Sequence, residues 1–456
     1  MIDATVTGSS LSALAAALDL AELGLRVRVV DTGDADQARD LAAADGDGVL
    51  QDFLDHVAAP LGGGEDPDEQ ASPLRVPPAP VWLPDVRGGW TRQPLPAVSG
   101  VPAVPLSHEA LAILGGGAAF RAYLDRLKPL LTIGKTRRLG TLVDKRLGPR
   151  VRERLVEPFA VERFGVGAAD VDAAVAAPGL NEAMSRAGAL TGGVLAESER
   201  TVARETAVVP GGGWSALDAA LRRKLRAFAV EFVDAGVASI ERTEAGWRVH
   251  DVAGGSFETR ALVLDAGRRV DAAWPDTDAE TAEELDEITA AARTRVRARL
   301  RVTPPEAVPE HAGPLLQRVT VAGQGSAPSS VRNEVWSVRL ELRETGHWVA
   351  ELAGPSEEPG REQPPLPSAI LAELLEAAGV SEAPGAEWDV LRVAAETPTL
   401  DERTRLRNAV SAFESRHAGS LLVVGRRVHG DSLAEAVRAA REESVPLRRH
   451  LTGIAE

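Results

Sequence analysis

The sequence of 456 residues contains no cysteine. It therefore forms no disulfide bond, and it offers neither a thiolate ligand for a metal nor a cysteine nucleophile. Hydrophobic residues make up 44% of the chain and charged residues 26%, which is typical of a globular protein. The length is sufficient for two or three domains, because a single hydrophobic core rarely grows to this size.

An excess of basic residues is also missing. The chain has 51 Lys and Arg against 67 Asp and Glu, a net charge of -16, which argues against a nucleic-acid partner. The longest apolar run near the start, residues 11–25, is interrupted by Asp19 and Glu22 and is not a membrane span. Residues 1–30 show no basic leader and no cleavage site. We expect a cytoplasmic protein without a transmembrane segment.

Patterns for two common kinds of catalytic site are absent as well. The eight histidines are scattered, and no two of them stand four residues apart, so we expect no metal site. Ser9, Ser10 and Ser12 do not form the G-x-S-x-G elbow of a hydrolase.

The N-terminal segment has the pattern of a strand, a tight turn, a helix, a second strand and an acid. Apolar residues at helical spacing follow Gly8, and Asp31 lies 23 residues after that glycine. This is close to the spacing of the acid that binds an adenosine ribose in dinucleotide-binding folds. The predicted elements are a strand at 4–7, a helix at 11–23 ending near Gly24, and a strand at 25–30.

The glycine motif itself is incomplete. Of the three glycines of G-x-G-x-x-G, Gly8 is kept, while Ser10 and Ala13 stand at the second and third positions. The second glycine normally lets the backbone approach the pyrophosphate, so the Ser10 side chain stands where a phosphate should lie. Two interpretations remain open: a dinucleotide site with an altered sequence, and a βαβ unit that binds no nucleotide.

Longer segments have the residue spacing of one flavoprotein family. An acid is followed by an arginine, a D-G-x-x-x-D pattern ends in a histidine, an R-L-G segment leads to L-V-E-P, and a Gly-rich turn opens a later helix. Through these segments the chain resembles the FAD-dependent protoporphyrinogen/coproporphyrinogen oxidase family, within the amine-oxidase type of flavoproteins. The segments are 31–39, 47–56, 89–96, 146–159 and 210–217.

The resemblance implies an α/β fold: a Rossmann-like FAD/NAD(P)-binding domain of the GR2 type, with an inserted helical region and a mixed-sheet substrate domain. The nucleotide-binding domain would comprise residues 1–75, 205–270 and 415–456. The sheet domain would comprise 76–107 and 271–414, and the helical region that caps the substrate 108–204.

Strands of the sheet domain are visible directly in the sequence. Trp336, Val338, Leu340 and Leu342 alternate with polar residues, and a second strand follows at 347–352, which predicts a β-hairpin. The Pro/Gly-rich stretches at 60–90 and 354–367 predict loops.

The C-terminal segment predicts a buried strand at 421–425 and a helix that begins with a Ser432–Glu435 capping box and runs to about Ser444. In the family this helix N-terminus faces the pyrimidine edge of the flavin, where reduced flavin carries negative charge. Ser432 replaces a glycine there. The Asp431 carboxylate would repel reduced flavin by a few kcal/mol, taking about 5 Å and an effective dielectric of about 20.

Glycines that the family places against FAD are repeatedly replaced, although the chain has 43 glycines. The replacements are Ser10, Gln37, Ala38, Leu54 and Ser432. This pattern favours a retained fold with an eroded cofactor site. If FAD binds, the resemblance implies contacts with Gly8, Ser9, Ser10, Leu11, Asp31, Arg39, Val237, Gly425, Gly430, Asp431 and Ser432.

Two functions therefore remain open. The favoured one is a non-catalytic or weakly flavin-binding homologue, a pseudoenzyme that binds a bulky small molecule or a protein partner. The alternative is a working FAD-dependent oxidoreductase that oxidises a porphyrinogen-like or other bulky reduced substrate, for which we name no catalytic residue. Whether the chain is an enzyme, and which oligomer it forms, stay open.

A cluster of arginines allows a similar choice. Arg146, Arg150, Arg152 and Arg154 would meet an anionic ligand in one interpretation. In the other they form a solvated helix face, paired with Glu153 and Glu157.

Overall fold

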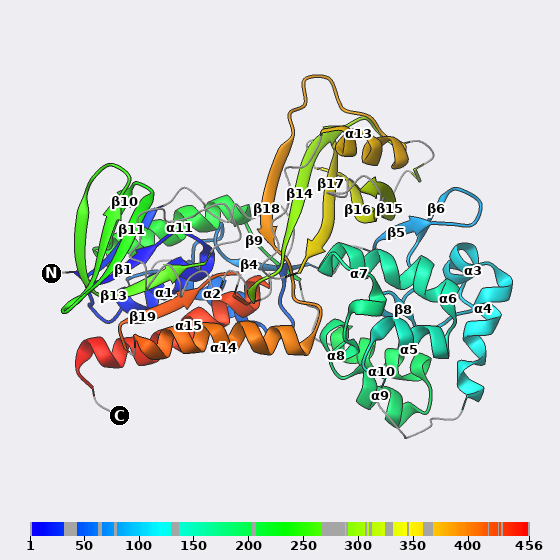
Figure 1. Ribbon diagram of the computed structural model, residues 1–456, viewed down its shortest axis with the longest axis horizontal. Coiled ribbons are helices and arrows are strands. Elements are labelled where there is room, and N and C mark those ends of the chain that lie inside the picture. The colour runs from blue at the N-terminus through cyan, green and yellow to red at the C-terminus, as the bar shows by residue number, and fades with distance from the viewer. Residues whose placement is uncertain are drawn as a thin grey trace. The chain divides into compact units, whose positions relative to one another are not determined.

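The chain forms two compact units in the computed structural model (Figure 1). Unit 1 comprises Met1–Pro78, Arg204–Ala292 and Thr404–Glu456, and unit 2 comprises Ala79–Ala203 and Arg293–Arg403. The structure describes residues 2–31, 43–62, 66–76, 80–128, 136–202, 207–266, 288, 291–305, 308–309, 312–323, 332–343, 346–358, 368–417, 419–426, 428–429 and 432–454.

Unit 1 is built on a sheet whose five parallel strands have the order β10-β2-β1-β13-β19. β11 and β12 extend it as an antiparallel pair on the first half of β13. Because the five strands are parallel, their carboxyl ends meet at one edge. The bounds are β1 Ile2–Thr7, β2 Val27–Asp31, β10 Glu231–Asp234, β11 Val237–Thr243, β12 Gly246–Asp251, β13 Ser256–Asp265 and β19 Leu421–Val424.

Successive side chains of each strand point to opposite faces of this sheet, and both faces are buried, as expected for parallel strands covered on both sides. Val6 and Val29 belong to a core with α1, α2, α11 and α15, whereas Val30 and Leu264 belong to a second core with the part of α14 in unit 1. The helices are α1 Leu11–Ala21, α2 Val49–Ala58, α11 Gly213–Ala227, α14 Leu400–Arg416 and α15 Leu433–Thr452. A small sheet of β3 Ala43–Ala44, β9 Ala207–Pro210 and β4 Pro73–Val76 completes the unit.

Unit 2 contains a mixed sheet of the order β18-β14-β17-β16-β15-β5-β6, with α13 (Ser368–Ala377) packed against it. The strands are β5 Trp82–Pro84, β6 Trp90–Arg92, β14 Thr294–Val302, β15 Leu315–Gly323, β16 Arg332–Leu342, β17 Trp348–Glu357 and β18 Asp389–Ala394.

A mainly helical part belongs to the same unit. Its helices are α3 His108–Leu114, α4 Gly116–Tyr123, α5 Leu139–Arg146, α6 Pro149–Val151, α7 Glu157–Phe164, α8 Ala173–Ala176, α9 Leu180–Ala187 and α10 Leu190–Val202. The short elements are 3-10 helices η1 Leu124–Leu127 and η3 Ala168–Asp170, a π-helical turn η2 Arg152–Val156, and the ribbon of β7 Ala97–Val98 and β8 Val101–Pro102.

The predicted hairpin is confirmed, because β16 and β17 pair in antiparallel register with Leu342 opposite Trp348. The expectation of loops over 60–90 is wrong in part, since β4 and β5 lie there and pair with β9 and β15. The stretch 354–367 also begins inside β17, and residues 359–367 lie outside the described residues.

The C-terminal helix is longer than predicted. α15 continues past Ser444 and through Pro446 to Thr452. Leu447 and Leu451 are buried in the unit 1 core, and this burial outweighs the hydrogen bond that proline cannot make.

Candidate functional site

The turn between β1 and α1 lies at the carboxyl edge of the unit 1 sheet. Gly8 has a φ of +110°, and its N–H donates to the Val30 carbonyl at 2.7 Å. Ser10 is the N-cap of α1, and its Oγ accepts the Ala13 N–H at 3.3 Å. In dinucleotide-binding folds the pyrophosphate lies at this helix N-terminus.

An acid from another strand occupies the same place. Asp265 is the last residue of β13, which pairs directly with β1. The Ser10 N–H donates to Asp265 Oδ2 at 2.9 Å, and the Ser10 hydroxyl donates to Oδ1 at 2.8 Å. Ser9 and Ser10 are only 3% and 2% exposed. The chain therefore supplies its own carboxylate to the N-terminus of α1.

Two glycines make room for this carboxylate. A Cβ on Gly8 would lie 2.5 Å from Asp265 Oδ2, and a Cβ on Gly425 would lie 3.1 Å from Oδ1 and 2.2 Å from the Ala266 carbonyl oxygen. Gly425 also has a φ of +123°, which side-chain-bearing residues rarely adopt. Three predicted site residues thus converge on an acid that sequence reasoning missed. The available signal was a buried strand, Ala261–Leu264, that ends in an aspartate as β2 does.

The remaining predicted residues lie at separate places. Ser9 and Leu11 flank Ser10 in the same turn, and Asp31 ends β2 opposite Asp234 of β10. Val237 begins β11 and is 7% exposed, opposite Asp251 of β12. Ser432 caps α15 by accepting the Glu435 N–H at 3.3 Å, as predicted. Arg39, Gly430 and Asp431, with Gln37 and Ala38, lie outside the described residues.

Leu54, one of the residues that replace glycine, packs in the unit 1 core with no exposed surface. His429, three residues before Ser432 in the sequence, is half-buried. Burial, aided by the charge of Arg407, lowers the pKa of His429 to about 4, so its imidazole is neutral at pH 7.

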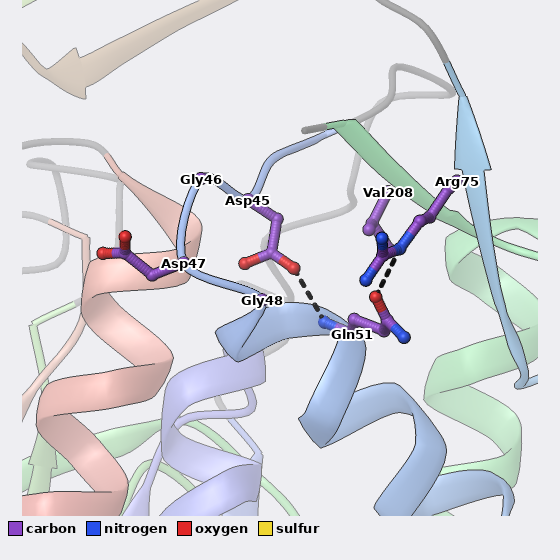
Figure 2. Close-up of a pocket in the computed structure, with 7 residues that line it drawn as sticks. All are labelled: Asp45, Gly46, Asp47, Gly48, Gln51, Arg75 and Val208. Carbon is purple, nitrogen blue, oxygen red and sulfur yellow. Dashed lines mark hydrogen bonds between the residues drawn. The ribbon is translucent and has the colours of Figure 1, made fainter. Parts of the chain in front are cut away.

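A polar cavity of about 400 Å³ lies beside the start of α2 (Figure 2). Asp45 accepts the N–H groups of Leu50 and Gln51 at 3.0 and 2.9 Å and so satisfies the first turn of the helix. Arg75 reaches over from β4 and donates through Nε to Gln51 Oε1 at 2.5 Å. Gly46, Asp47, Gly48 and Val208 complete the lining.

Asp19, Glu22 and His56 offer ligand atoms within 4.8 Å of one another. Arg441 lies 3.2 Å from His56 Nδ1, and because guanidinium only donates, Nδ1 accepts and Nε2–H donates to Glu22 at 2.7 Å. A metal on Nε2 would move the remaining proton to Nδ1, against the Arg441 donor. Burial raises the pKa of Asp19, which Arg441 also contacts at 3.4 Å. The geometry fits an ion-pair network better than a metal site.

The arginine cluster is distributed over several short helices rather than one. Arg146 is buried and donates to Asp125 Oδ1 at 2.5 Å, Arg152 pairs with Glu157 at 2.6 Å, and Arg154 donates to a backbone carbonyl. The pairing of Arg152 with Glu157 and Glu153 agrees with the second interpretation, but the burial of Arg146 contradicts a wholly solvated face.

Comparison with known proteins identifies the fold. No family model matches the sequence, and no curated protein matches it. Among solved structures, a putative protoporphyrinogen oxidase from an Exiguobacterium species is 17% identical, covers 98% of each chain and has a TM-score of 0.64. A reduced UDP-galactopyranose mutase is 14% identical, with 100% of this chain and 96% of that chain covered and a TM-score of 0.58.

A third structure, a fatty acid isomerase from P. acnes that produces CLA, is 11% identical, covers 97% of each chain and has a TM-score of 0.54. These matches confirm the predicted fold class, an α/β flavoprotein fold of the GR2 type with a mixed-sheet second part. The low identities show the fold alone. In the described part of the chain, no helix is long and apolar enough to cross a membrane.

Proposed function

We propose that this chain keeps the flavoprotein fold without using FAD as a redox cofactor, and that it acts as a ligand-binding or partner protein. The observation that supports this is the Asp265 carboxylate, which accepts the N–H and the hydroxyl of Ser10 at the N-terminus of α1.

The residues of the turn do not fit the diphosphate of FAD. A diphosphate needs N–H donors at the start of the helix and a surface that it can reach. Here the Ser10 N–H already donates to an anion, and Ser10 is 2% exposed. A phosphate at this place would meet a carboxylate instead of bare backbone.

The ligand of such a protein would be a bulky small molecule or a protein partner. The cavity beside α2 offers a separate polar site of small-molecule size, with the Arg75 guanidinium and the Gln51 amide in its wall. Asp47, also in the wall, pairs with Arg438 at 2.8 Å, and Asp45 is held by helix N–H groups, so both acids already have partners.

The test is the flavin content of the freshly purified protein. We expect a colourless protein, with FAD released by denaturation well below one per chain, and no flavin uptake when the protein is incubated with FAD and passed through a desalting column. A yellow protein with one FAD per chain would contradict the proposal.

A working FAD-dependent oxidoreductase is the second candidate. It is favoured by the matching fold and by the positive φ angles of Gly8, in the turn after β1, and Gly425, directly after β19. Stoichiometric FAD that a bulky reduced substrate bleaches in the absence of oxygen would establish this function.

A further inference from the structure

We infer that Asp265 is the residue that excludes a dinucleotide's diphosphate from the turn at Gly8–Ser10. This inference rests on the proposed function and deepens it, because it assigns the loss of the cofactor to one side chain. Asp265 acts as an internal anion in place of the phosphate.

The geometry of the turn carries the assignment. Helix α1 is 11 residues long and almost entirely buried, so the unsatisfied N–H groups of its first turn need an acceptor. The Asp265 carboxylate supplies one through two short contacts with Ser10, at 2.9 and 2.8 Å. It also receives the favourable field of the helix N-terminus, which would otherwise act on a bound anion.

The contact between Asp265 and Ser10 follows from the strand order of the sheet. β1 and β13 are parallel neighbours, with Val6 opposite Val263 and Thr7 opposite Leu264, so Asp265 necessarily follows at the level of Gly8. The missing Cβ of Gly8 is what lets the carboxylate lie there, since a Cβ would stand 2.5 Å from Oδ2. In this chain the glycine of the motif accommodates an aspartate.

Charge gives the size of the effect. Two unit negative charges about 5 Å apart weaken binding about fourfold in the dielectric of water and a few hundredfold at an effective dielectric of about 20. Asp265 is half-buried, so its surroundings lie between these two cases. Removing the charge from Asp265 should therefore strengthen diphosphate binding at least tenfold.

The experiment compares Asp265→Asn and Asp265→Ala with the wild type, using ADP as a diphosphate probe and adenosine as a phosphate-free probe. Calorimetry or ligand-observed NMR gives the affinities at low salt. We expect ADP to bind at least tenfold more tightly to both variants, adenosine to bind unchanged, and the ADP gain to shrink as salt is added. FAD binding should rise in parallel.

Two further variants isolate the cause. Asp234→Asn removes the same charge from an exposed acid at the end of β10, on the same sheet edge, and should leave ADP binding at the wild-type level. Ser10→Gly restores the glycine of the motif but keeps the carboxylate, and should also give no gain. Asp265→Asn keeps an oxygen that accepts from Ser10, so it provides the test if Asp265→Ala fails to unfold cooperatively.

The outcomes separate this inference from the proposed function. If the wild type lacks FAD and the Asp265 variants bind ADP no better than Asp234→Asn, the assignment to Asp265 is overturned while the proposed function stands. A larger gain from Ser10→Gly than from Asp265→Asn would overturn it in the same way. If the wild type carries stoichiometric FAD, both are overturned.

Discussion

The Asp125–Arg146 pair decides whether the arginine cluster holds the fold or binds an anion. Asp125 is fully buried, and its Oδ1 accepts Arg146 Nε at 2.5 Å, while Oδ2 accepts the N–H and hydroxyl of Thr191 at 3.0 and 3.3 Å. Arg146 also donates to the Asp125 carbonyl at 3.1 Å. Arg146→Met removes the compensating charge and leaves a buried carboxylate.

Breaking a buried pair on one side typically costs about 3–5 kcal/mol. We expect Arg146→Met to lower the free energy of unfolding by about 3 kcal/mol. This is the lower end of the range, because both Thr191 donors remain on Asp125 Oδ2. Adding Asp125→Asn should restore part of this loss, since the residual charge then disappears. The double variant should therefore be more stable than the sum of the two single losses predicts.

Urea unfolding followed by circular dichroism measures these differences. Arg150→Met is the matched control, because Arg150 is exposed on the neighbouring helix α6, and its free energy of unfolding should change by less than about 0.5 kcal/mol. Equal urea midpoints for Arg146→Met and Arg150→Met would refute the structural role of Arg146 and return the cluster to the anion-binding interpretation.

Further outcomes follow for three other sites. Burial, then Glu414, Glu442 and Glu435, raises the pKa of Glu443 from 4.5 to about 7. The folded state therefore binds the extra proton, and its contribution to stability is full below about pH 4.5 and lost as the pH rises through about 7. In thermal melts the Glu443→Gln variant should be more stable than the wild type by about 1–2 kcal/mol at alkaline pH, a figure reduced for the partial exposure of this side chain. At acidic pH the two proteins should be equally stable. A stability difference that does not change with pH would contradict this. Gly354→Ala places a Cβ 2.8 Å from the buried Trp336 ring and should cost about 1–3 kcal/mol and change the near-UV spectrum, whereas Gly117→Ala, which meets no atom within 4 Å, should not. Zinc should not raise the melting temperature of the wild type, because Arg441 faces His56 Nδ1; a zinc-dependent rise that His56→Gln abolishes would show a metal site.

Local patterns in the sequence predicted much of the fold. The alternation of apolar and polar residues over Trp336–Leu342 predicted a strand of the unit 2 sheet, and Asp31, directly after Val30, marked the end of β2. Both signals depend only on residues that are close together in the sequence. The length of α15 was missed because Pro446 resembles a stop, and the burial of Leu447 and Leu451 depends on tertiary packing. The partner of Arg146 was missed for the same reason, since Asp125 lies 21 residues earlier on a different element.

In the candidate site, too, the decisive contact joins residues that are far apart in the sequence. The turn at Gly8 was recognisable, but Asp265 stands 255 residues from Ser10, and no spacing rule connects them. The connection exists because β13 pairs with β1 across the sheet, which is a fact of topology. A strand that ends in an acid has no fixed meaning until its neighbours are known.

This changes how the loss of glycines should be weighed. Counting replaced glycines would attribute the proposed loss of the cofactor to side chains such as Ser10 that fill space. Yet the Ser10 N–H is directed away from α1, and the Ser10 hydroxyl caps this helix. A serine at this position is compatible with a phosphate that accepts from both groups. Under the proposed function, the residue that is incompatible with a phosphate is Asp265, which accepts both donors of Ser10. In dinucleotide-binding folds an acid at the end of the second strand receives ribose hydroxyls, which are neutral donors. Under the proposed function, the acid at the end of β13 lies instead where such a ligand would place its negative charge. The same residue type at two strand ends, one on each side of β1, therefore has opposite consequences for a dinucleotide.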